Sequence, residues 1–183
     1  MRTAKPMNRP SQHTTPRAKR RLLPRWMALI PTPVVLLLGH VVVPQQLSLL
    51  SARHGWAHGG PGWLNLLGLI PIGAGAAFLV WCFRLHFVGV RDSFEMERTQ
   101  KYLVVGGPYL FTRNPMYLCG MLIWLGWIIF YGSVAVLAGT VVIWGTVGML
   151  VVPWEERNLE ARFGEVYLRY KHSVPRWLGR RSR

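Results

Sequence analysis

Residues 114–154 read NPMYLCGMLIWLGWIIFYGSVAVLAGTVVIWGTVGMLVVPW, and this stretch decides the fold. It holds no Asp, Glu, Lys or Arg over 41 residues. That is too long for a single helix across the apolar core of a bilayer, which is about 30 Å thick. The stretch therefore predicts two membrane spans, at about 116–131 and 134–152, that fold back on each other as a helical hairpin. Gly132 lies between them and is the expected turn.

Two further stretches without charged residues predict two more spans. Residues 26–52 and 54–83 have no Asp, Glu, Lys or Arg apart from Arg53 between them, and we place spans at about 27–43 and 63–83. Over all 183 residues, 51% are hydrophobic and nine are Trp. This composition excludes a soluble globular enzyme and predicts an all-α integral membrane protein. The length fits one domain, taken as residues 26–183.

The basic residues predict how the chain is oriented. There are 22 Lys and Arg against 7 Asp and Glu, a net charge of +15. The segment 1–25 has eight basic residues, four prolines and no acid, which indicates a disordered basic tail. With four spans and both termini in the cytosol, 21 of the 22 basic residues are cytosolic, as the positive-inside rule requires. Anionic lipids are the expected partner of the tail, at about 1 kcal/mol per basic residue.

Other interpretations of the tail fit less well. A signal peptide is disfavoured because no small-x-small cleavage site follows Val43, and the prolines disfavour the amphipathic helix of a transit peptide. Nucleic acid is not expected as a partner, since the tail has no aromatic residue for base stacking before Trp26. The compact, Arg-rich chain favours a bacterial inner membrane.

The acidic residues also cluster on the expected cytosolic side. From Glu155 to Lys171 apolar residues recur at helical spacing, which predicts a cytosolic amphipathic helix over about 155–171. The hairpin returns the outer ends of its two spans to one face, so Arg113 and Asn114 should lie near Glu155 and Glu156. Acids at a membrane boundary need a partner, either Arg113 or a bound cation. A plain interfacial salt bridge would satisfy them equally.

Two local patterns have both a structural and a functional interpretation. Pro115 fits the first turn of the third span with Asn114 as its cap, and the free amides there could bind a carboxylate. The small residues 73–77 in the second span allow close helix packing or leave room for a flat ligand. Cys82 and Cys119 lie in apolar runs as small buried residues, and neither the cysteines nor the histidines form a metal-binding pattern, so no metal is expected.

An ordered set of motifs covers roughly residues 63–177. Its members are Gly73-x-Gly75, Gly107-Pro108-Tyr109, Arg113-Asn114-Pro115-Met116-Tyr117, Glu155-Glu156, Phe163-Gly164, Tyr167, Tyr170 and Val174-Pro175. Together they resemble the integral-membrane methyltransferases, which include the phospholipid (phosphatidylethanolamine N-) and the isoprenylcysteine carboxyl methyltransferases. Asn114, Gly73 and Gly75 resemble the phospholipid branch. The carboxyl methyltransferases, in contrast, more often have His at the position of Asn114. The segment after Leu159 is more similar to the carboxyl methyltransferases.

The resemblance implies S-adenosyl-L-methionine as methyl donor, bound at the cytosolic face. The residues that it implies for the cofactor are Gly73, Gly75, Gly107, Tyr109, Arg113, Asn114, Pro115, Tyr117, Glu155 and Glu156. Arg113 or nearby amides would take the cofactor carboxylate, and the two glutamates its ammonium or ribose hydroxyls. Arg113 and Glu156 are the implied catalytic residues, and an amine acceptor would lose its proton to Glu156 or His86.

The predicted function is therefore methyl transfer to a lipid or lipid-like acceptor, on N or O. The alternative is a non-catalytic small helical membrane protein that binds lipid or acts as a subunit. A transporter is disfavoured, because no charged residue lies inside the spans and no inverted repeat is visible.

Overall fold

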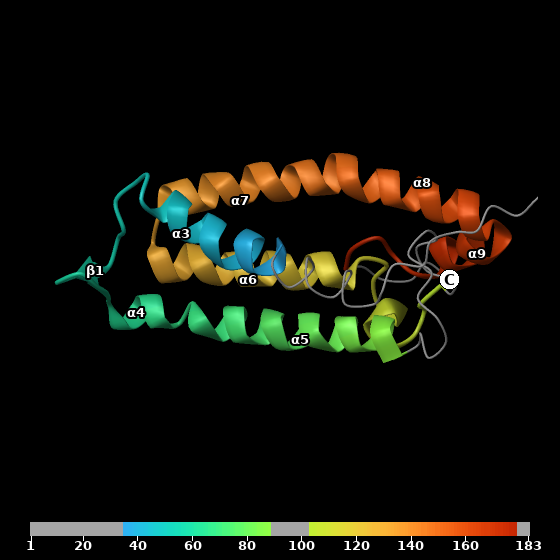
Figure 1. Ribbon diagram of the computed structural model, residues 1–183, viewed down its shortest axis with the longest axis horizontal. Coiled ribbons are helices and arrows are strands. Elements are labelled where there is room, and N and C mark those ends of the chain that lie inside the picture. The colour runs from blue at the N-terminus through green and yellow to red at the C-terminus, as the bar shows by residue number, and fades with distance from the viewer. Residues whose placement is uncertain (1–34, 89–102, 179–183) are drawn as a thin grey trace, which may run out of the picture.

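The computed structural model describes residues 35–88 and 103–178, most of which are helical. Figure 1 shows the long helices side by side along one axis. The elements, in chain order, are η1 (Leu38–Val42), α3 (Val43–Ser48), β1 (Trp56–Ala57), β2 (Gly60–Pro61), α4 (Trp63–Leu66), α5 (Leu69–Val88), η2 (Gly107–Leu110), α6 (Pro115–Tyr131), α7 (Val134–Thr146), η3 (Val147–Val151), α8 (Val152–Phe163) and α9 (Glu165–Ser173). The predicted helical class is confirmed, with one two-residue hairpin in addition.

Among the described residues, two helices are long and apolar enough to cross a membrane, Trp63–Leu85 and Val134–Phe163. Only 17% and 6% of their most apolar windows are buried, so most of these side chains face outward. The core helix of a soluble protein would show the opposite pattern. Shorter apolar helices over Val35–Ser48 and Pro115–Tyr131 lie beside them.

The first helix ends later than the sequence suggested. We expected a span ending at about residue 43, but the helix continues through α3 to Ser48. Pro44 does not stop it, because this residue stands in the first turn of α3, directly after the π-helical turn η1. The expected start of this span, the basic tail and the acids of residues 92–97 lie outside the described residues.

The predicted hairpin turn is confirmed. Gly132 ends α6 with φ 56° and ψ 30°, a left-handed conformation that glycine adopts without strain, and its N–H donates to the Ile128 carbonyl. The Ser133 hydroxyl then caps α7 by accepting from the Val136 N–H. The chain reverses in two residues, and α6 and α7 run antiparallel.

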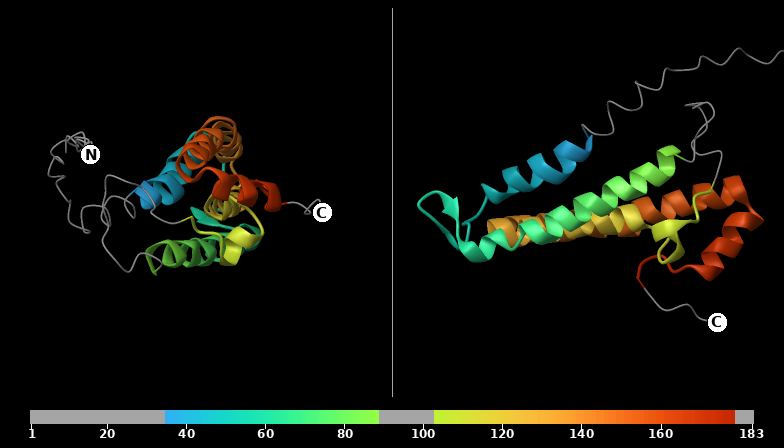
Figure 2. Two further views of the ribbon diagram at one scale, coloured as in Figure 1. Left: turned by 90° about the vertical axis from the view of Figure 1, so that its right-hand side faces the viewer. Right: turned by 90° about the horizontal axis from the view of Figure 1, so that it is seen from below.

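The predicted cytosolic helix over 155–171 is wrong in both its limits and its continuity. No break separates span four from it, since α7, η3 and α8 form one helix from Val134 to Phe163. The break comes at Gly164, where φ is 53° and ψ is −130°, and α9 begins on its other side. A side chain disfavours that conformation, so glycine sets the turn. In Figure 2 the short helix α9 folds back from the end of α8.

Helix α6 lies at the centre and packs on α5, α7 and α3. Its contact with α5 depends on glycines that remove side chains from the interface. A Cβ on Gly126 would lie 2.5 Å from the Gly68 carbonyl oxygen and 2.9 Å from the Ile72 nitrogen. A Cβ on Gly75 would lie 2.8 Å from the Cys119 carbonyl oxygen. The two backbones are therefore in direct contact between Gly68 and Gly75, over the first part of α5.

At the end of the bundle near the β1–β2 hairpin, Asn65 joins three segments. It is 6% exposed, and its side-chain amide donates to the carbonyls of His54 (3.0 Å) and Ile129 (3.1 Å). Replacement by Leu, similar in volume, is expected to lower the free energy of unfolding by about 1–3 kcal/mol, because two buried carbonyls lose their donor. Thermal unfolding in detergent measures this. Asn158→Leu, on an exposed part of α8, is the control, and equal losses would contradict the assignment.

Candidate functional site

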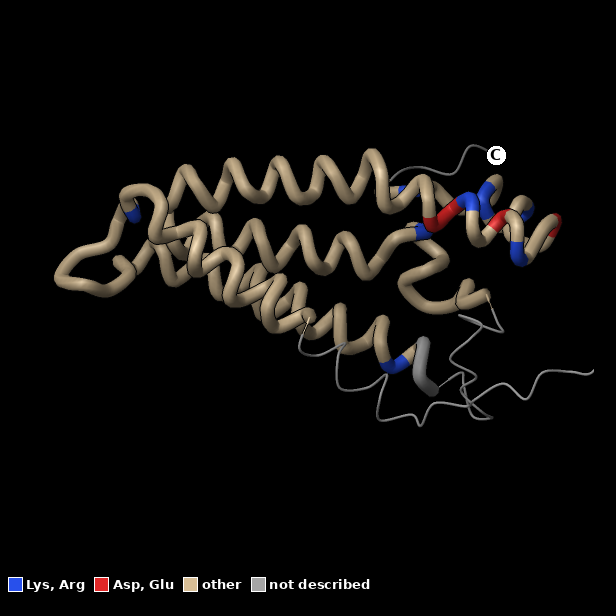
Figure 3. Tube along the Cα trace, turned by 45° about the horizontal axis from the view of Figure 1, so that its top comes forward, with Lys and Arg blue, Asp and Glu red and all other residues tan. Residues whose placement is uncertain are grey.

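Charged residues gather at one end of the bundle, as Figure 3 shows. Among the residues that the structure describes, Arg53 is the exception. It lies beside the α6–α7 turn, where it bridges to Ser133, and its guanidinium is 4.7 Å from the Trp56 ring centre and 5.2 Å from that of Tyr131. The acids and the other basic side chains lie around α8, α9 and the outer ends of α5 and α6. The polar chemistry of the described chain is therefore concentrated at one end.

The centre of this end is a carboxylate held by two guanidinium groups. Glu156 is 4% exposed, and Arg113 Nη1 lies 3.0 Å from its Oε1. Arg176 donates to both carboxylate oxygens, from Nε to Oε1 at 3.0 Å and from Nη2 to Oε2 at 2.6 Å. These two hydrogen bonds to the Glu156 carboxylate raise the pKa of Arg176. The expected proximity of Arg113 and Glu156 across the hairpin is confirmed.

Arg113 keeps donors that the protein does not use. Its side chain is 10% exposed, and its Nε and Nη1 are buried without a hydrogen-bond partner among the described residues. Nη1 is close to Glu156 but not directed at it. Unused donors on a buried cation are costly, and a bound anion would satisfy them. A carboxylate, with two acceptor oxygens, fits a guanidinium edge.

The backbone before α6 is clamped to the end of the chain. The Arg113 N–H donates to the Pro175 carbonyl at 2.9 Å, and the Thr112 hydroxyl and the Asn114 amide each donate to the Arg176 carbonyl at 3.0 Å. Asn114 stands at the N-cap of α6, as expected, but its side chain makes no capping bond. The predicted capping role is thus replaced by this clamp, because the Arg176 carbonyl comes within reach when α9 folds back.

The second glutamate is in a different situation. Glu155 is half-buried and lies close to the Tyr117 hydroxyl on α6. Neither guanidinium of the cluster pairs with it among the described residues. Glu155 therefore keeps more of its acceptor capacity than Glu156, which already pairs with two guanidinium groups.

Three tyrosines surround the cluster. Tyr170 donates its hydroxyl proton to the Tyr109 carbonyl at 2.8 Å, which ties α9 to η2. Burial raises the pKa of Tyr170 to about 12 and also raises the pKa of Tyr109 and of Tyr167. Tyr167 is 1% exposed and lies beside Arg113. The three tyrosines are therefore uncharged and line the Arg113–Glu156–Arg176 cluster.

The predicted cofactor residues divide into two groups. The structure brings Arg113, Asn114, Pro115, Tyr117, Glu155 and Glu156 together, with Tyr109 next to them. Gly107 has φ 61° and faces α5, where an added Cβ would lie 2.9 Å from Leu85. The two glycines of α5 do not join the cluster: Gly75 faces α6, and Gly73 has nothing within 4 Å of its Cβ position. Close helix packing, not ligand space, explains Gly75.

Sequence reasoning did not find Arg176, which lies beyond the helix that it predicted. The only signal was Gly164, because a chain reversal there returns residues 174–176 toward Glu156. Cys82 and Cys119 are both buried and form no disulfide, as expected of small buried residues. Within residues 35–88 and 103–178, no group of three or more His, Cys, Asp or Glu could hold a metal ion.

Outward-facing apolar helices with a buried ion cluster at one end define a membrane-type helical protein with a polar site. The family model described as phospholipid methyltransferase matches residues 63–166, more than half of the chain, and the protein belongs to this family. An uncharacterized protein of Haemophilus influenzae (strain ATCC 51907 / DSM 11121 / KW20 / Rd) is 36% identical over 63 residues, which are 34% of this chain and all of that protein. No solved structure matches. The resemblance found in the motifs is thereby confirmed.

Proposed function

We propose that this protein transfers a methyl group from S-adenosylmethionine to a lipid or lipid-like acceptor at the cytosolic face of a membrane. The observation that carries the proposal is the buried guanidinium of Arg113, paired with Glu156 but with its Nε unused by the described residues, together with the half-buried Glu155 next to Glu156 in the chain. Both residues lie in the segment that matches the phospholipid methyltransferase family.

In the proposed topology four spans cross the membrane, and both termini lie in the cytosol. The concentration of basic residues at the end that carries α8 and α9 supports this orientation. We place the protein in a bacterial inner membrane, with the basic tail near anionic lipid headgroups. Residues 1–25 and 26–183 remain our division of the chain into tail and membrane domain.

The residues present fit the cofactor. The Nε of Arg113, which has no partner among the described residues, suits its carboxylate, and Glu155 suits its ammonium or a ribose hydroxyl. Tyr109 and Tyr117 offer aromatic surface near these charges, for the adenine or for the sulfonium cation. Glycines 73 and 75 are not part of this proposal, because they lie away from the cluster.

Glu156 has a positioning role in this proposal. Two guanidinium groups already pair with its carboxylate, so it is a poor ligand for a further cation. It fixes the guanidinium of Arg113 and holds the end of the chain against α6 through Arg176. The side chain of His86, the other candidate for a proton acceptor, lies outside the described residues.

The protein's contribution to methyl transfer is mainly geometric. The cofactor, when bound, supplies an electrophilic methyl group on a sulfonium. Arg113 and Glu155 would fix the two ends of its amino acid part, and the three tyrosines around the cluster would exclude water from the charged end. Alignment of donor and acceptor then lowers the barrier.

Glu155→Gln is expected to weaken the binding of S-adenosylmethionine and S-adenosylhomocysteine by about tenfold or more, the equivalent of one charge-assisted hydrogen bond. Isothermal titration in detergent with mixed lipids measures this. Glu165→Gln, on the exposed first turn of α9, is the control and should bind like the unchanged protein. The double change Glu155→Gln with Glu156→Gln should abolish binding.

The second candidate function is a non-catalytic lipid-binding protein or subunit. It is favoured if the folded, unchanged protein binds neither cofactor form. In that case the Arg113–Glu156–Arg176 cluster serves only to join α6, α8 and the end of the chain, and Glu155→Gln would leave lipid binding unaltered.

A further inference from the structure

The Arg113–Glu156–Arg176 cluster carries one positive charge in excess. Its two arginines share the single carboxylate of Glu156, and Glu155 pairs with neither guanidinium among the described residues. An uncompensated charge is costly away from water, so a bound anion would stabilise the cluster. The contacts of Glu156 show which of the two arginines presents the excess charge.

Arg176 occupies both oxygens of Glu156. Its Nε donates to Oε1 at 3.0 Å and its Nη2 to Oε2 at 2.6 Å, which is the side-on geometry of a two-bond guanidinium–carboxylate pair. Arg113 places Nη1 3.0 Å from Oε1, but this nitrogen makes no hydrogen bond within the described chain. Arg176 is thus the main counter-charge of Glu156, and the excess positive charge belongs to Arg113.

Arg113 is the more buried of the two cations. Its side chain is 10% exposed against 38% for that of Arg176. The Nε of Arg113 is buried and has no partner in the part of the chain that the structure describes. A buried donor that belongs to an unbalanced cation fits an anionic group with acceptor oxygens, such as a carboxylate.

Main-chain hydrogen bonds also hold residue 176 in place. The Arg176 carbonyl accepts from the Thr112 hydroxyl and from the Asn114 amide, each at 3.0 Å, and the Arg113 N–H donates to the Pro175 carbonyl at 2.9 Å. These bonds do not involve the guanidinium, so they remain when the side chain of residue 176 is shortened. The charge can therefore be removed while the segment that carries it stays attached.

We infer that Arg176 is a positioning residue of the cofactor site, which acts through Glu156 on Arg113. It takes up the Glu156 carboxylate and so leaves the Nε edge of Arg113 to the carboxylate of S-adenosylmethionine. Without the Arg176 guanidinium the cluster has no excess charge, and Glu156 competes with the cofactor carboxylate for Arg113. The inference rests on the proposed function, and it gives a role to a residue beyond the matched segment 63–166.

The test compares two ligands that differ only in the carboxylate. S-adenosylhomocysteine has it, whereas its decarboxylated analogue keeps the amine, the ribose and the adenine. Isothermal titration in detergent with mixed lipids measures the Kd of each. Arg176→Ala is expected to raise the Kd of S-adenosylhomocysteine by about tenfold, the equivalent of one charge-assisted hydrogen bond, and to leave that of the analogue unchanged. A merely structural role would raise both alike.

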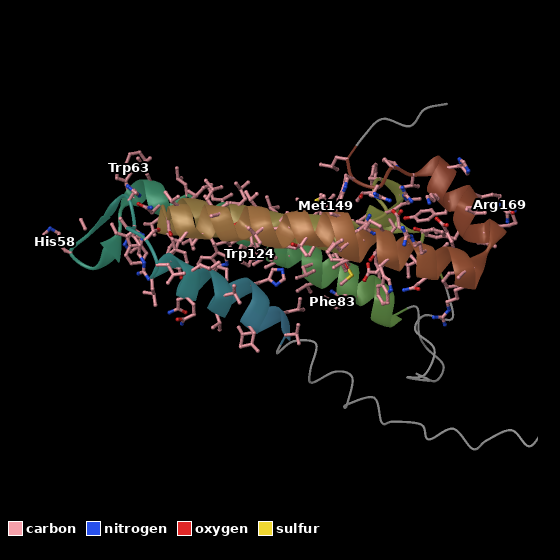
Figure 4. All side chains as sticks on the ribbon, turned by 90° about the horizontal axis from the view of Figure 1, so that it is seen from above. His58, Trp63, Phe83, Trp124, Met149 and Arg169 are labelled. Carbon is pink, nitrogen blue, oxygen red and sulfur yellow. The ribbon has the colours of Figure 1, made fainter. Side chains whose placement is uncertain are left out.

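Further variants separate the local charge from the overall charge. Arg176→Lys keeps a positive charge next to Glu156 and should retain most of the preference for the carboxylate. Lys171→Ala is the matched control, because it removes the basic partner of Glu160, also on α8, from a partly exposed pair. Arg169→Ala removes an exposed charge at the outer end of the bundle (Figure 4). Both controls lower the net charge by one, as Arg176→Ala does, and should bind both ligands like the unchanged protein.

Equal losses for the two ligands, or an unchanged Kd for S-adenosylhomocysteine in Arg176→Ala, would overturn the inference. Thermal unfolding shows whether this variant is folded, and Arg176→Gln, which keeps a donor but no charge, gives the same comparison if it is not. Failure of the inference alone leaves the unchanged protein with a preference for S-adenosylhomocysteine over the analogue. If the unchanged protein binds neither ligand, the proposed function fails as well.

Discussion

Glu156→Gln is expected to destabilise the protein by about 3–5 kcal/mol, because it leaves a buried cation without its counter-charge. Arg113 is 10% exposed and cannot turn to water, whereas the side chain of Arg176 is 38% exposed and can. Arg176→Ala should therefore cost less than Glu156→Gln. The loss is measured as the change in free energy of unfolding in detergent.

The chain contains a matched control for this prediction. Glu160, on the same helix α8 as Glu156, pairs with Lys171 on α9, with 31% and 36% of the side chains exposed. Exposed pairs contribute about 0–1 kcal/mol, so Glu160→Gln should change the stability little. If the two variants unfold alike, the Glu156 cluster does not hold the end of the chain.

The second large effect is expected at the contact of α5 with α6. Gly126→Ala would place a Cβ 2.5 Å from the Gly68 carbonyl oxygen and 2.9 Å from the Ile72 nitrogen, and backbone atoms cannot move aside as side chains do. We expect a loss of about 1–3 kcal/mol from Gly126→Ala, and a larger loss from Gly126→Val.

Gly73→Ala is the corresponding control. It lies in α5 with nothing within 4 Å of its Cβ position, so alanine should be neutral or stabilise the helix by up to about 1 kcal/mol. Thermal unfolding of both variants separates helix propensity from contact. A loss for Gly73→Ala as large as that for Gly126→Ala would contradict the packing assignment.

Much of the fold could be predicted, because it depends on properties that can be read along the sequence, such as the length of a stretch without charged residues. The length of a charge-free stretch determines whether it folds back, and Gly132 was its only plausible turn. The proximity of Arg113 and Glu156 then followed from an antiparallel pair of helices. None of these inferences needed to know which faces of the helices pack.

The remainder depended on three-dimensional detail. Gly164 stands in a segment whose apolar spacing is helical on both sides, so the reversal there was not visible, and with it Arg176 and the true role of Asn114 were missed. The glycines at 73 and 75 are two residues apart, but they point to different sides of α5. Only the position of α6 shows that one of them faces a backbone and the other faces outward.

The unbroken helix Val134–Phe163 has a consequence for how membrane thickness acts on the protein. Its 30 residues extend about 45 Å, more than the apolar core of a bilayer of about 30 Å. In the proposed topology Glu155 and Glu156 lie on the part of this helix that projects from the lipid, and no break in the helix separates them from the membrane span. A thicker or thinner bilayer would tilt this rod and so change the height of both carboxylates above the acyl chains. The thickness of the membrane would thus determine the distance between the two carboxylates and a lipid head group.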